Sequence, residues 1–243
     1  MPNPYKLLSV IIPVYNESST IAEVIEKVSA VTLAIEKEII VVDDGSTDGT
    51  VEALAQNLDK VTNTYLTPVN RGKGAAVRIG LTMVRGDIIL IQDADLELDP
   101  YEFCDLIQPI LDGRTSVVYG SRFLKQNSVP SIRRFANYFL TKTTNLFFGT
   151  NLTDMETAYK VFTREVADKL RLGSNRFEIE PEITAQLALL GYEILEVPIS
   201  YRPRTSLEGK KIKWKDGAKA FWTLVKYRFL VESVAGNGRE KSD

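Results

Sequence analysis

The sequence predicts an α/β fold in which helices cover both faces of a mostly parallel central sheet. Short apolar runs rich in Val and Ile alternate with segments of helical periodicity, which is the pattern of parallel strands joined by helical crossovers. Four polar signals directly follow four of the predicted strands. Because such sheets bind ligands beyond the carboxyl ends of their strands, we expect the signals to meet at one edge. They lie at residues 13–17, 43–44, 93–95 and 120–122.

Strands and helices are predicted in alternation over the first half of the chain. Residues 7–14 read as a buried apolar strand, and Pro13 indicates that this strand leaves the sheet near its end. A capping-box pattern from Thr20 to Glu23 precedes apolar residues spaced three and four apart, which predicts a helix packed on the sheet. Further strands are predicted at 38–42, 61–66, 86–92 and 116–120, and further helices begin near residues 50, 74 and 100.

The second half is less regular. Helices are predicted at 131–149, 180–190 and 215–231, and strands at 157–162 and 193–200. We interpret residues 1–231 as a single domain that ends in a basic amphipathic helix at about 214–231. Residues 232–243 have the composition of a disordered tail.

The composition excludes several classes of site. The chain has 243 residues, enough for a sizeable core, but it has no His, the usual general base and zinc ligand. The single Cys104 excludes an internal disulfide and a cysteine metal cluster. The N-terminus lacks the pattern of a signal peptide, and no run approaches the roughly 18 apolar residues of a membrane span. We therefore expect a cytoplasmic protein.

Basic residues gather near the C-terminal end of the chain. Residues 202–228 contain nine basic residues against two acidic ones, which indicates an anionic partner. The predicted C-terminal helix also carries several aromatic and apolar residues, a composition that suits a membrane surface. These residues are Trp214, Phe221, Trp222, Val225 and Phe229. The alternative is that they are buried core and that the lysines merely flank it.

The acidic stretch Asp93-Ala94-Asp95 follows a buried strand. In an extended chain residues two apart point the same way, so the two carboxylates are expected to face one side together. Side-by-side carboxylates repel each other unless a cation or proton lies between them, and Mg²⁺ and Mn²⁺ prefer oxygen ligands. Glu97 adds a possible third oxygen. The alternative is a solvated turn followed by a helix that Asp99 caps.

The motifs together resemble the family 2 inverting glycosyltransferases of GT-A fold. Within that family the chain is most similar to the branch of dolichol-phosphate mannose synthase and polyprenyl-phosphate glucosyltransferases. The resemblance covers roughly residues 7–226 and rests on several motifs in order, each in its strand-loop context. The motifs are Pro13-Val14-Tyr15-Asn16-Glu17, residues 42–50 (VDDGSTDGT), residues 70–74 (NRGKG), Asp93-Ala94-Asp95, Gly120-Ser121-Arg122, residues 154–160 (DMETAYK) and residues 197–204 (VPISYRPR).

The resemblance implies a nucleotide-sugar site at the first strand ends. Four residues would line the base and ribose, namely Pro13, Tyr15, Glu17 and Asp44, while Asp43 would face the structure beneath. Lys73 and Ala94 would belong to the same site, and Asp93 would contact the ribose or the donor sugar. Asp95, with Glu97, would bind Mg²⁺ or Mn²⁺ that bridges the diphosphate. The synthase branch often has Gln at the position of Glu97.

The resemblance also implies an anion site built from basic residues. Arg122 and Arg204, with Lys210 or Lys211, would hold the donor diphosphate and the acceptor phosphate. The two lysines could instead belong to a solvated basic loop. Asp154 could orient the acceptor, act as a general base, or be a turn residue after Thr153.

The implied reaction is transfer of a hexose, with inversion, from a nucleotide-diphosphate sugar to polyprenyl phosphate. A phosphomonoester has a second pKa of about 6 and needs no general base, which suits a chain without His. GDP-mannose, UDP-glucose and UDP-N-acetylglucosamine all remain possible donors. Acceptor access would require a membrane surface or a membrane-anchored subunit, so we expect a peripheral location on the cytoplasmic face.

Other functions remain open. The same chemistry on a soluble glycan or protein is one alternative, and a non-catalytic sugar-nucleotide-binding subunit is another. Phosphoryl transfer of the haloacid-dehalogenase type is disfavoured because there the acidic pair ends the first strand, whereas here it ends roughly the fourth. Nucleic acid is not an expected partner because no recognition motif is present.

Overall fold

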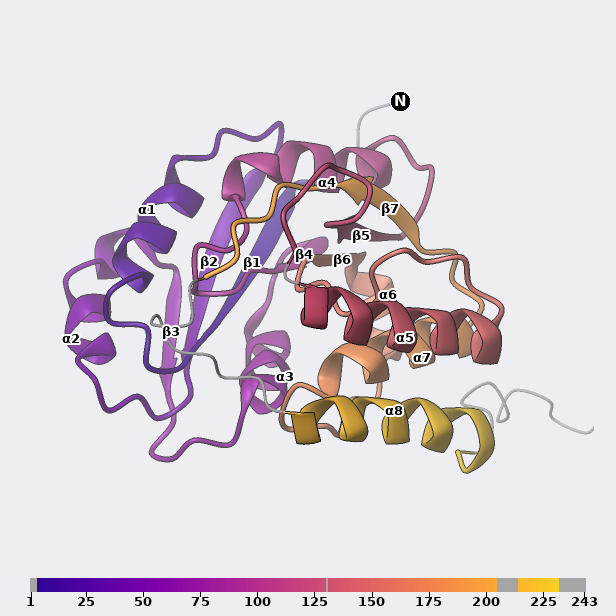
Figure 1. Ribbon diagram of the computed structural model, residues 1–243. Helices are drawn as coiled ribbons and strands as arrows, with labels where there is room; N and C mark the ends of the chain where they lie inside the picture. Colours follow the sequence, from indigo (N-terminus) through magenta and orange to yellow (C-terminus); the bar gives the residue numbers. More distant parts are fainter. Residues whose placement is uncertain (1–3, 130, 205–213, 232–243) are drawn as a thin grey trace, which may run out of the picture.

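The computed structural model describes residues 4–129, 131–204 and 214–231. Its centre is a twisted sheet of seven strands in the order β3-β2-β1-β4-β6-β5-β7 (Figure 1). The strands are β1 (Leu7–Val14), β2 (Glu36–Asp43), β3 (Asn63–Leu66), β4 (Ile88–Ile91), β5 (Val117–Ser121), β6 (Lys160–Thr163) and β7 (Leu195–Pro198). Every neighbouring pair is parallel except the two that involve β6. The predicted mostly parallel α/β fold is confirmed.

Helices cover both faces of this sheet. The helices are α1 (Ile21–Ala30), α2 (Thr50–Ala55), α3 (Lys73–Met83), α4 (Phe103–Leu111), α5 (Ser131–Phe148), α6 (Arg164–Lys169), α7 (Ile179–Leu189) and α8 (Trp214–Phe229), with short 3-10 turns at Leu58–Lys60 and Pro100–Glu102. Alternate residues of β1 enter different cores: Val10 and Ile12 pack with α1 and α4, and Ile11 packs with α3 and α7. This alternation is the expected geometry of a strand buried on both sides.

Pro13 lies where one ladder of β1 has already ended. Pairing with β4 stops at Ile11, whereas pairing with β2 continues to Val14. Backbone groups of Ile11 and Pro13 point toward β4, since Gln92 N donates to Ile11 O and Asp44 N to Val14 O on the other side. A proline without an N–H therefore removes no sheet hydrogen bond at this position.

The capping box predicted for α1 is wrong. Thr20 is the N-cap residue, but its side chain makes no capping hydrogen bond. Its hydroxyl instead donates to Ala94 O at 2.8 Å. The helix itself is confirmed, with Ile21, Val24, Ile25 and Val28 buried. The threonine thus joins the loops after β1 and β4 rather than closing its own helix.

Helices α5 and α8 pack on each other through aromatic side chains. Phe139 of α5 stacks on Phe221 of α8 at a centroid distance of 5.8 Å, and Phe147 meets Phe229 edge-on at 5.5 Å. The C-terminal helix ends at Phe229, two residues before its predicted end. In the described chain no helix is both long and apolar enough to cross a bilayer. The predicted tail, residues 232–243, lies outside the described residues.

Candidate active site at the carboxyl edge of the sheet

The loops after β1 and β2 are joined to each other and to the turn before α3. Asn16 N donates to Ser46 Oγ at 2.9 Å, which holds the first two loops together. Asp44 is buried, and its carboxylate accepts from the backbone N–H groups of Arg71 at 2.9 Å and Gly72 at 2.5 Å. Gly72 has a φ of +106°, and a Cβ there would come within 2.5 Å of Asn175 O, so only glycine fits this turn.

The two carboxylate oxygens of Asp43 have different surroundings. Its Oδ1 accepts from Gly45 N and Ser46 N at 3.1 and 2.9 Å, which fixes the turn after β2. Its Oδ2 is buried and accepts no hydrogen bond from the described residues. An unpaired buried acceptor is costly, so this edge of the sheet offers a place for an N–H donor. Pro13 and Ala94 are also buried, and Tyr15 is partly exposed.

Lys73 places one positive charge between two acids. Its Nζ lies 2.6 Å from Asp93 Oδ1 and 2.8 Å from Glu180 Oε1. Burial alone would lower the pKa of Lys73, but the two carboxylates raise this pKa above its ordinary value, so the ammonium stays charged. Burial opposes ionisation of Glu180 as well, yet Lys160 and Lys73 lower its pKa.

The spacing of Asp93 and Asp95 predicted that both carboxylates face one side of an extended strand. This prediction is wrong. Strand β4 ends at Ile91, and the chain turns at residues 94–95, with Leu96 at a φ of +57°. Asp93 therefore contacts Lys73 while Asp95 contacts Arg204. The turn separates the two carboxylates and gives each its own cation.

Arg204 joins the first and fourth strand ends. Its Nη2 lies 2.9 Å from Glu17 Oε1 and 3.0 Å from Asp95 Oδ2. Glu97 accepts from Arg204 N at 3.0 Å and from the Tyr201 hydroxyl at 3.1 Å, so it anchors the segment that carries the arginine. The Nε of Arg204 is buried and donates to no acceptor among the described residues.

The residues present fit a divalent cation that is completed by a ligand. No group of three or more His, Cys, Asp and Glu side chains in the described chain could hold a metal by itself. Asp95 Oδ1 accepts from Glu97 N at 3.1 Å and Asp95 Oδ2 lies 3.0 Å from Arg204 Nη2, while the Glu97 oxygens accept from Tyr201 and Arg204. Mg²⁺ is often held by one or two carboxylates together with substrate phosphates. Asp95 and Glu97 are the two carboxylates at this rim that fit that role.

Arg122 and Asp154 form a bidentate pair at the end of β5. Arg122 Nε and Nη2 donate to the two carboxylate oxygens at 2.7 and 2.8 Å, and Arg122 N donates at 3.0 Å. Asn137 of α5 adds a fourth bond to Asp154 at 2.9 Å. Burial would lower the pKa of Arg122, but Asp154 raises it, so the guanidinium keeps its charge. Asp154 is fully buried, and these donors occupy both of its oxygens.

Three charged residues that the sequence did not single out complete this cluster. Lys160, fully buried at the start of β6, pairs with Glu180 Oε2 at 2.7 Å. Glu156 lies in the loop between Asp154 and Lys160, and its Oε1 is buried without a donor in the described part of the chain. The only available signal was the position of Glu156 and Lys160 in the motif at 154–160.

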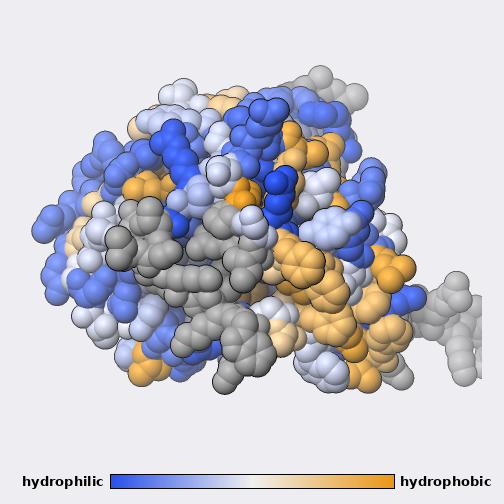
Figure 2. Space-filling view, in the orientation of Figure 1, coloured by the Kyte–Doolittle hydropathy of each residue, from blue (hydrophilic) through white to orange (hydrophobic). Residues whose placement is uncertain are grey.

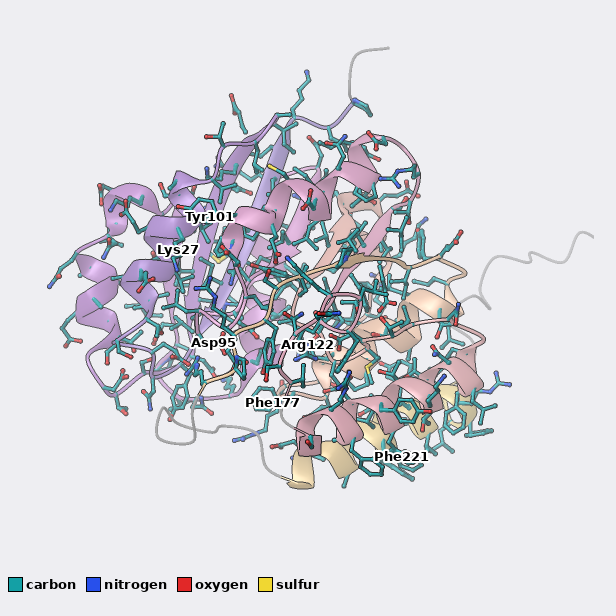
Figure 3. The ribbon with its side chains drawn as sticks, turned by 45° about the horizontal axis from the view of Figure 1, so that its top comes forward. Lys27, Asp95, Tyr101, Arg122, Phe177 and Phe221 are labelled. Atoms are coloured by element: carbon teal, nitrogen blue, oxygen red, sulfur yellow. The ribbon has the colours of Figure 1, made fainter. Side chains whose placement is uncertain are left out.

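Most of the predicted site residues therefore converge on one edge of the sheet. In Figure 3, Asp95 and Arg122 both lie near the centre of the loop face, while Phe221 lies to one side on α8. Side-chain contacts connect Glu17, Arg204 and Asp95, and a second set connects Lys73 with Asp93. Lys210 and Lys211 lie outside the described residues.

Comparison with protein families decides which family has this arrangement. Residues 9–171 match the model of glycosyl transferase family 2. The chain belongs to this family. The match spans β1 to α6 and so includes the loops that carry Glu17, Asp44, Asp95, Arg122 and Asp154.

The curated relatives of this family member include proteins named for lipid-phosphate acceptors. The low-salt glycan biosynthesis hexosyltransferase Agl6 of Haloferax volcanii is 33% identical over 235 residues, covering 94% of this chain and 54% of the relative. The chain thus spans about half the length of Agl6. Dolichyl-phosphate beta-glucosyltransferase ALG5A of Trichomonas vaginalis is 28% identical, with coverage of 90% and 72%. The predicted resemblance to the polyprenyl-phosphate branch is confirmed.

Solved structures confirm the GT-A fold. Glucosyl-3-phosphoglycerate synthase from Mycobacterium tuberculosis, crystallised with Mn²⁺, uridine diphosphate and phosphoglyceric acid, superposes with a TM-score of 0.73. The superposition covers 94% of this chain and 80% of that one, at 22% sequence identity. At this identity the likeness shows the fold alone.

Proposed function

We propose that the protein transfers a hexose, with inversion, from a nucleotide-diphosphate sugar to polyprenyl phosphate, with the help of Mg²⁺ or Mn²⁺. The observation that carries the proposal is the convergence of Glu17, Arg204 and Asp95 on one edge, beside the Lys73–Asp93 pair. This reaction requires carboxylates that bind a metal ion and the sugar. It also requires cations that bind the phosphates.

On the donor side, the loops after β1 and β2 are proposed to bind the nucleoside. Asp43 Oδ2 is a buried acceptor that suits an N–H of the base, and Tyr15 directly follows Val14, the residue of β1 that pairs with Asp43. Asp44 supports this site indirectly, because its carboxylate holds the turn at residues 70–72. Pro13 and Ala94 contribute buried surface, and Asp93, held by Lys73, is proposed to contact the donor sugar.

The site is proposed to act mainly by stabilising the negative charge that develops on the leaving diphosphate. A cation bound at Asp95 would supply Lewis-acid stabilisation of the diphosphate. Arg204 already lies at Asp95, and its unpaired Nε is a donor directed at no protein acceptor among the described residues. Arg122 offers a second permanent positive charge. Preorganised donors of this kind stabilise developing charge better than water does.

The acceptor proposal rests on the relatives and on the helices beside the site. Relatives are named dolichyl-phosphate and undecaprenyl-phosphate transferases. Helices α5 and α8 expose an apolar face that we call the α5–α8 face, defined by Phe135, Tyr138, Phe139, Leu146, Phe221, Trp222 and Phe229. Figure 2 shows it as an orange area over these two helices. The sequences of these helices contain seven basic residues and one acid, Asp216.

An exposed apolar face with basic residues beside it suits an anionic bilayer. Aromatic and aliphatic side chains enter the interface, and each basic residue near an anionic surface adds about 1 kcal/mol. We therefore propose that the protein binds peripherally to the cytoplasmic face of a membrane, with this face toward the lipid. A membrane-anchored subunit could cover the same face.

The proposal is tested first at the donor site and then at the acceptor. Thermal unfolding is measured with GDP and with UDP, each with and without Mn²⁺, because a ligand of the native state raises its apparent stability. We expect one nucleotide to raise Tm in a Mn²⁺-dependent manner, and Asp95→Ala to abolish the effect. The corresponding nucleotide sugar is then incubated with extracted polyprenyl phosphate, and glycolipid product is measured.

Three results would contradict the proposal. Absence of any nucleotide-dependent shift, with or without metal, would count against a donor site at this edge. Metal-dependent nucleotide binding without transfer to any acceptor would instead indicate a non-catalytic sugar-nucleotide-binding subunit. Transfer to soluble glycans but not to the lipid would place the protein with the soluble-acceptor enzymes.

A further inference from the structure

Glu156 lies at the boundary between two buried ion pairs. It follows Asp154, which pairs with Arg122, and precedes Lys160, which pairs with Glu180. Its backbone N–H donates to Asn137 Oδ1 at 3.2 Å, and the Asn137 amide donates to Asp154 at 2.9 Å. The loop that carries Glu156 is therefore fixed at both ends and held against α5.

The charges around Glu156 leave this carboxyl without a cation of its own. Two cations act on it, Arg122 and Lys160, and each already pairs with an acid. These acids are Asp154 and Glu180. Glu156 is a third acid, and its Oε1 is buried with no donor among the described residues. A carboxyl in this position binds a proton or meets a ligand that supplies one.

The electrostatics of the cluster agree with this geometry. Burial raises the pKa of Glu156 to about 7, and the negative charges of Glu180 and Asp154 act in the same direction. Lys160 and Arg122 act against this rise, but each already faces its own acid. Near neutral pH the group therefore exchanges its proton readily.

Glu156 lies on the side of the site that adjoins the α5–α8 face. Asn137, which holds its backbone, belongs to α5, the helix that also exposes Phe135, Tyr138 and Phe139. The nucleoside side of the site, at Asp43 and Asp44, belongs to the loops after β2. A lipid head group that arrives from the α5–α8 face would thus meet Arg122 and Glu156.

We infer that Glu156 and the phosphate of the acceptor share one proton, which Glu156 keeps when the phosphate attacks. The inference rests on the proposed function, since it assumes a phosphomonoester acceptor. An unprotonated phosphate oxygen forms the bond to the anomeric carbon, and the bond from that carbon to the donor diphosphate breaks. The diphosphate leaves with the electron pair, and the proton remains on the Glu156 carboxyl.

The inference is tested by the pH dependence of acceptor KM. Initial rates of wild type and Glu156→Gln are measured with a short-chain prenyl phosphate from about pH 6.5 to about pH 8.5. Ionised Glu156 repels the phosphate dianion, so we expect the wild-type KM to rise about tenfold per pH unit above 7. Glutamine is a neutral mimic of the protonated acid, so the KM of Glu156→Gln should change little.

The control is Glu165→Gln, which replaces an exposed acid of α6 that pairs with Lys169 and should keep the wild-type KM profile. The KM for the donor sugar should be the same in all three proteins. As a second measurement, the ³¹P shift of bound prenyl phosphate should titrate at different pH values in wild type and Glu156→Gln.

The outcomes separate this inference from the proposed function. If wild type transfers the sugar and KM rises equally with pH in Glu156→Gln, the inference of a shared proton is wrong and the proposed function stands. Loss of the rise in Glu165→Gln as well would also overturn it, because the effect would then come from the removal of any negative charge. No transfer to prenyl phosphate by wild type at any pH would overturn the proposed acceptor together with the inference.

Discussion

The sequence leaves three roles open for Asp154, and at the residue scale the structure shows where its oxygens are used. Both accept hydrogen bonds from Arg122, and Asn137 donates a further one. Both oxygens of this fully buried carboxylate are thus already engaged by donors of the protein. The geometry favours the positioning of Arg122 over general-base catalysis.

We predict that Asp154→Asn destabilises the protein by about 3 kcal/mol, because removal of one partner leaves a buried guanidinium without its counter-charge. Equilibrium unfolding in urea measures this change. The matched control is Asp112→Asn, whose partner Arg114 lies 3.4 Å away on the surface. There we expect a loss below about 1 kcal/mol. Equal losses of stability at the two positions would contradict the prediction that the buried Arg122–Asp154 pair contributes more than the surface pair.

Site residues could be predicted from the sequence where the signal lies in the neighbouring residues. Asp44, Asp95 and Arg122 directly follow strands, so strand order alone places them at one edge. Glu180 pairs with Lys73 and Lys160, which reach it only through tertiary packing. Thr20 shows that a local signal can also mislead. Its sequence pattern predicts a capping hydrogen bond, but its hydroxyl donates to Ala94 O, 74 residues away.

At the scale of elements, periodicity predicted most strands and helices but not the direction of β6. An apolar run of this kind fits either orientation, and the direction is fixed by the chain path from α5. The six-residue helix α6 was also missed, because it contributes only Val166 to the fully buried core. Short helices give too few turns for a clear repeat.

The packing of α5 on α8 yields a prediction about membrane binding. We expect the double variant Leu146→Gln with Trp222→Gln to weaken binding to vesicles that contain anionic lipid by at least about tenfold, because each side chain loses apolar transfer energy. Leu146 is 82% exposed and Trp222 59% exposed, so neither change opens the core. Vesicle sedimentation measures the bound fraction.

The control for this prediction uses exposed apolar residues elsewhere on the molecule. Leu58 is 53% exposed and Tyr101 59% exposed, and Figure 3 places Tyr101 away from Phe221. Leu58→Gln with Tyr101→Gln should leave vesicle binding unchanged. Equal binding by both double variants, or binding that neutral vesicles support as well as anionic ones, would contradict the assigned membrane face.

At the scale of the whole molecule, the unbalanced acid makes stability depend on pH with a definite sign. The pKa of Glu156 is raised from 4.5 to about 7 on folding. Between these values the folded protein holds a proton that the unfolded chain has released. The free energy of unfolding therefore falls as pH rises through this window and stays lower above it. The full effect is about 3 kcal/mol.

Glu156→Gln should remove this dependence. We expect the variant to gain stability relative to wild type as pH rises from about 5 to about 8, by up to about 3 kcal/mol, because the variant buries no charge at either pH. Urea unfolding at the two pH values measures the gain, and any cost of fitting the glutamine itself cancels in the comparison. A variant whose stability relative to wild type is the same at both values would show that Glu156 is not held as an unbalanced acid. Proteins retain acids that lower their stability near neutral pH mainly where catalysis requires them. The expected gain in Glu156→Gln would therefore support the catalytic inference without any measurement of turnover.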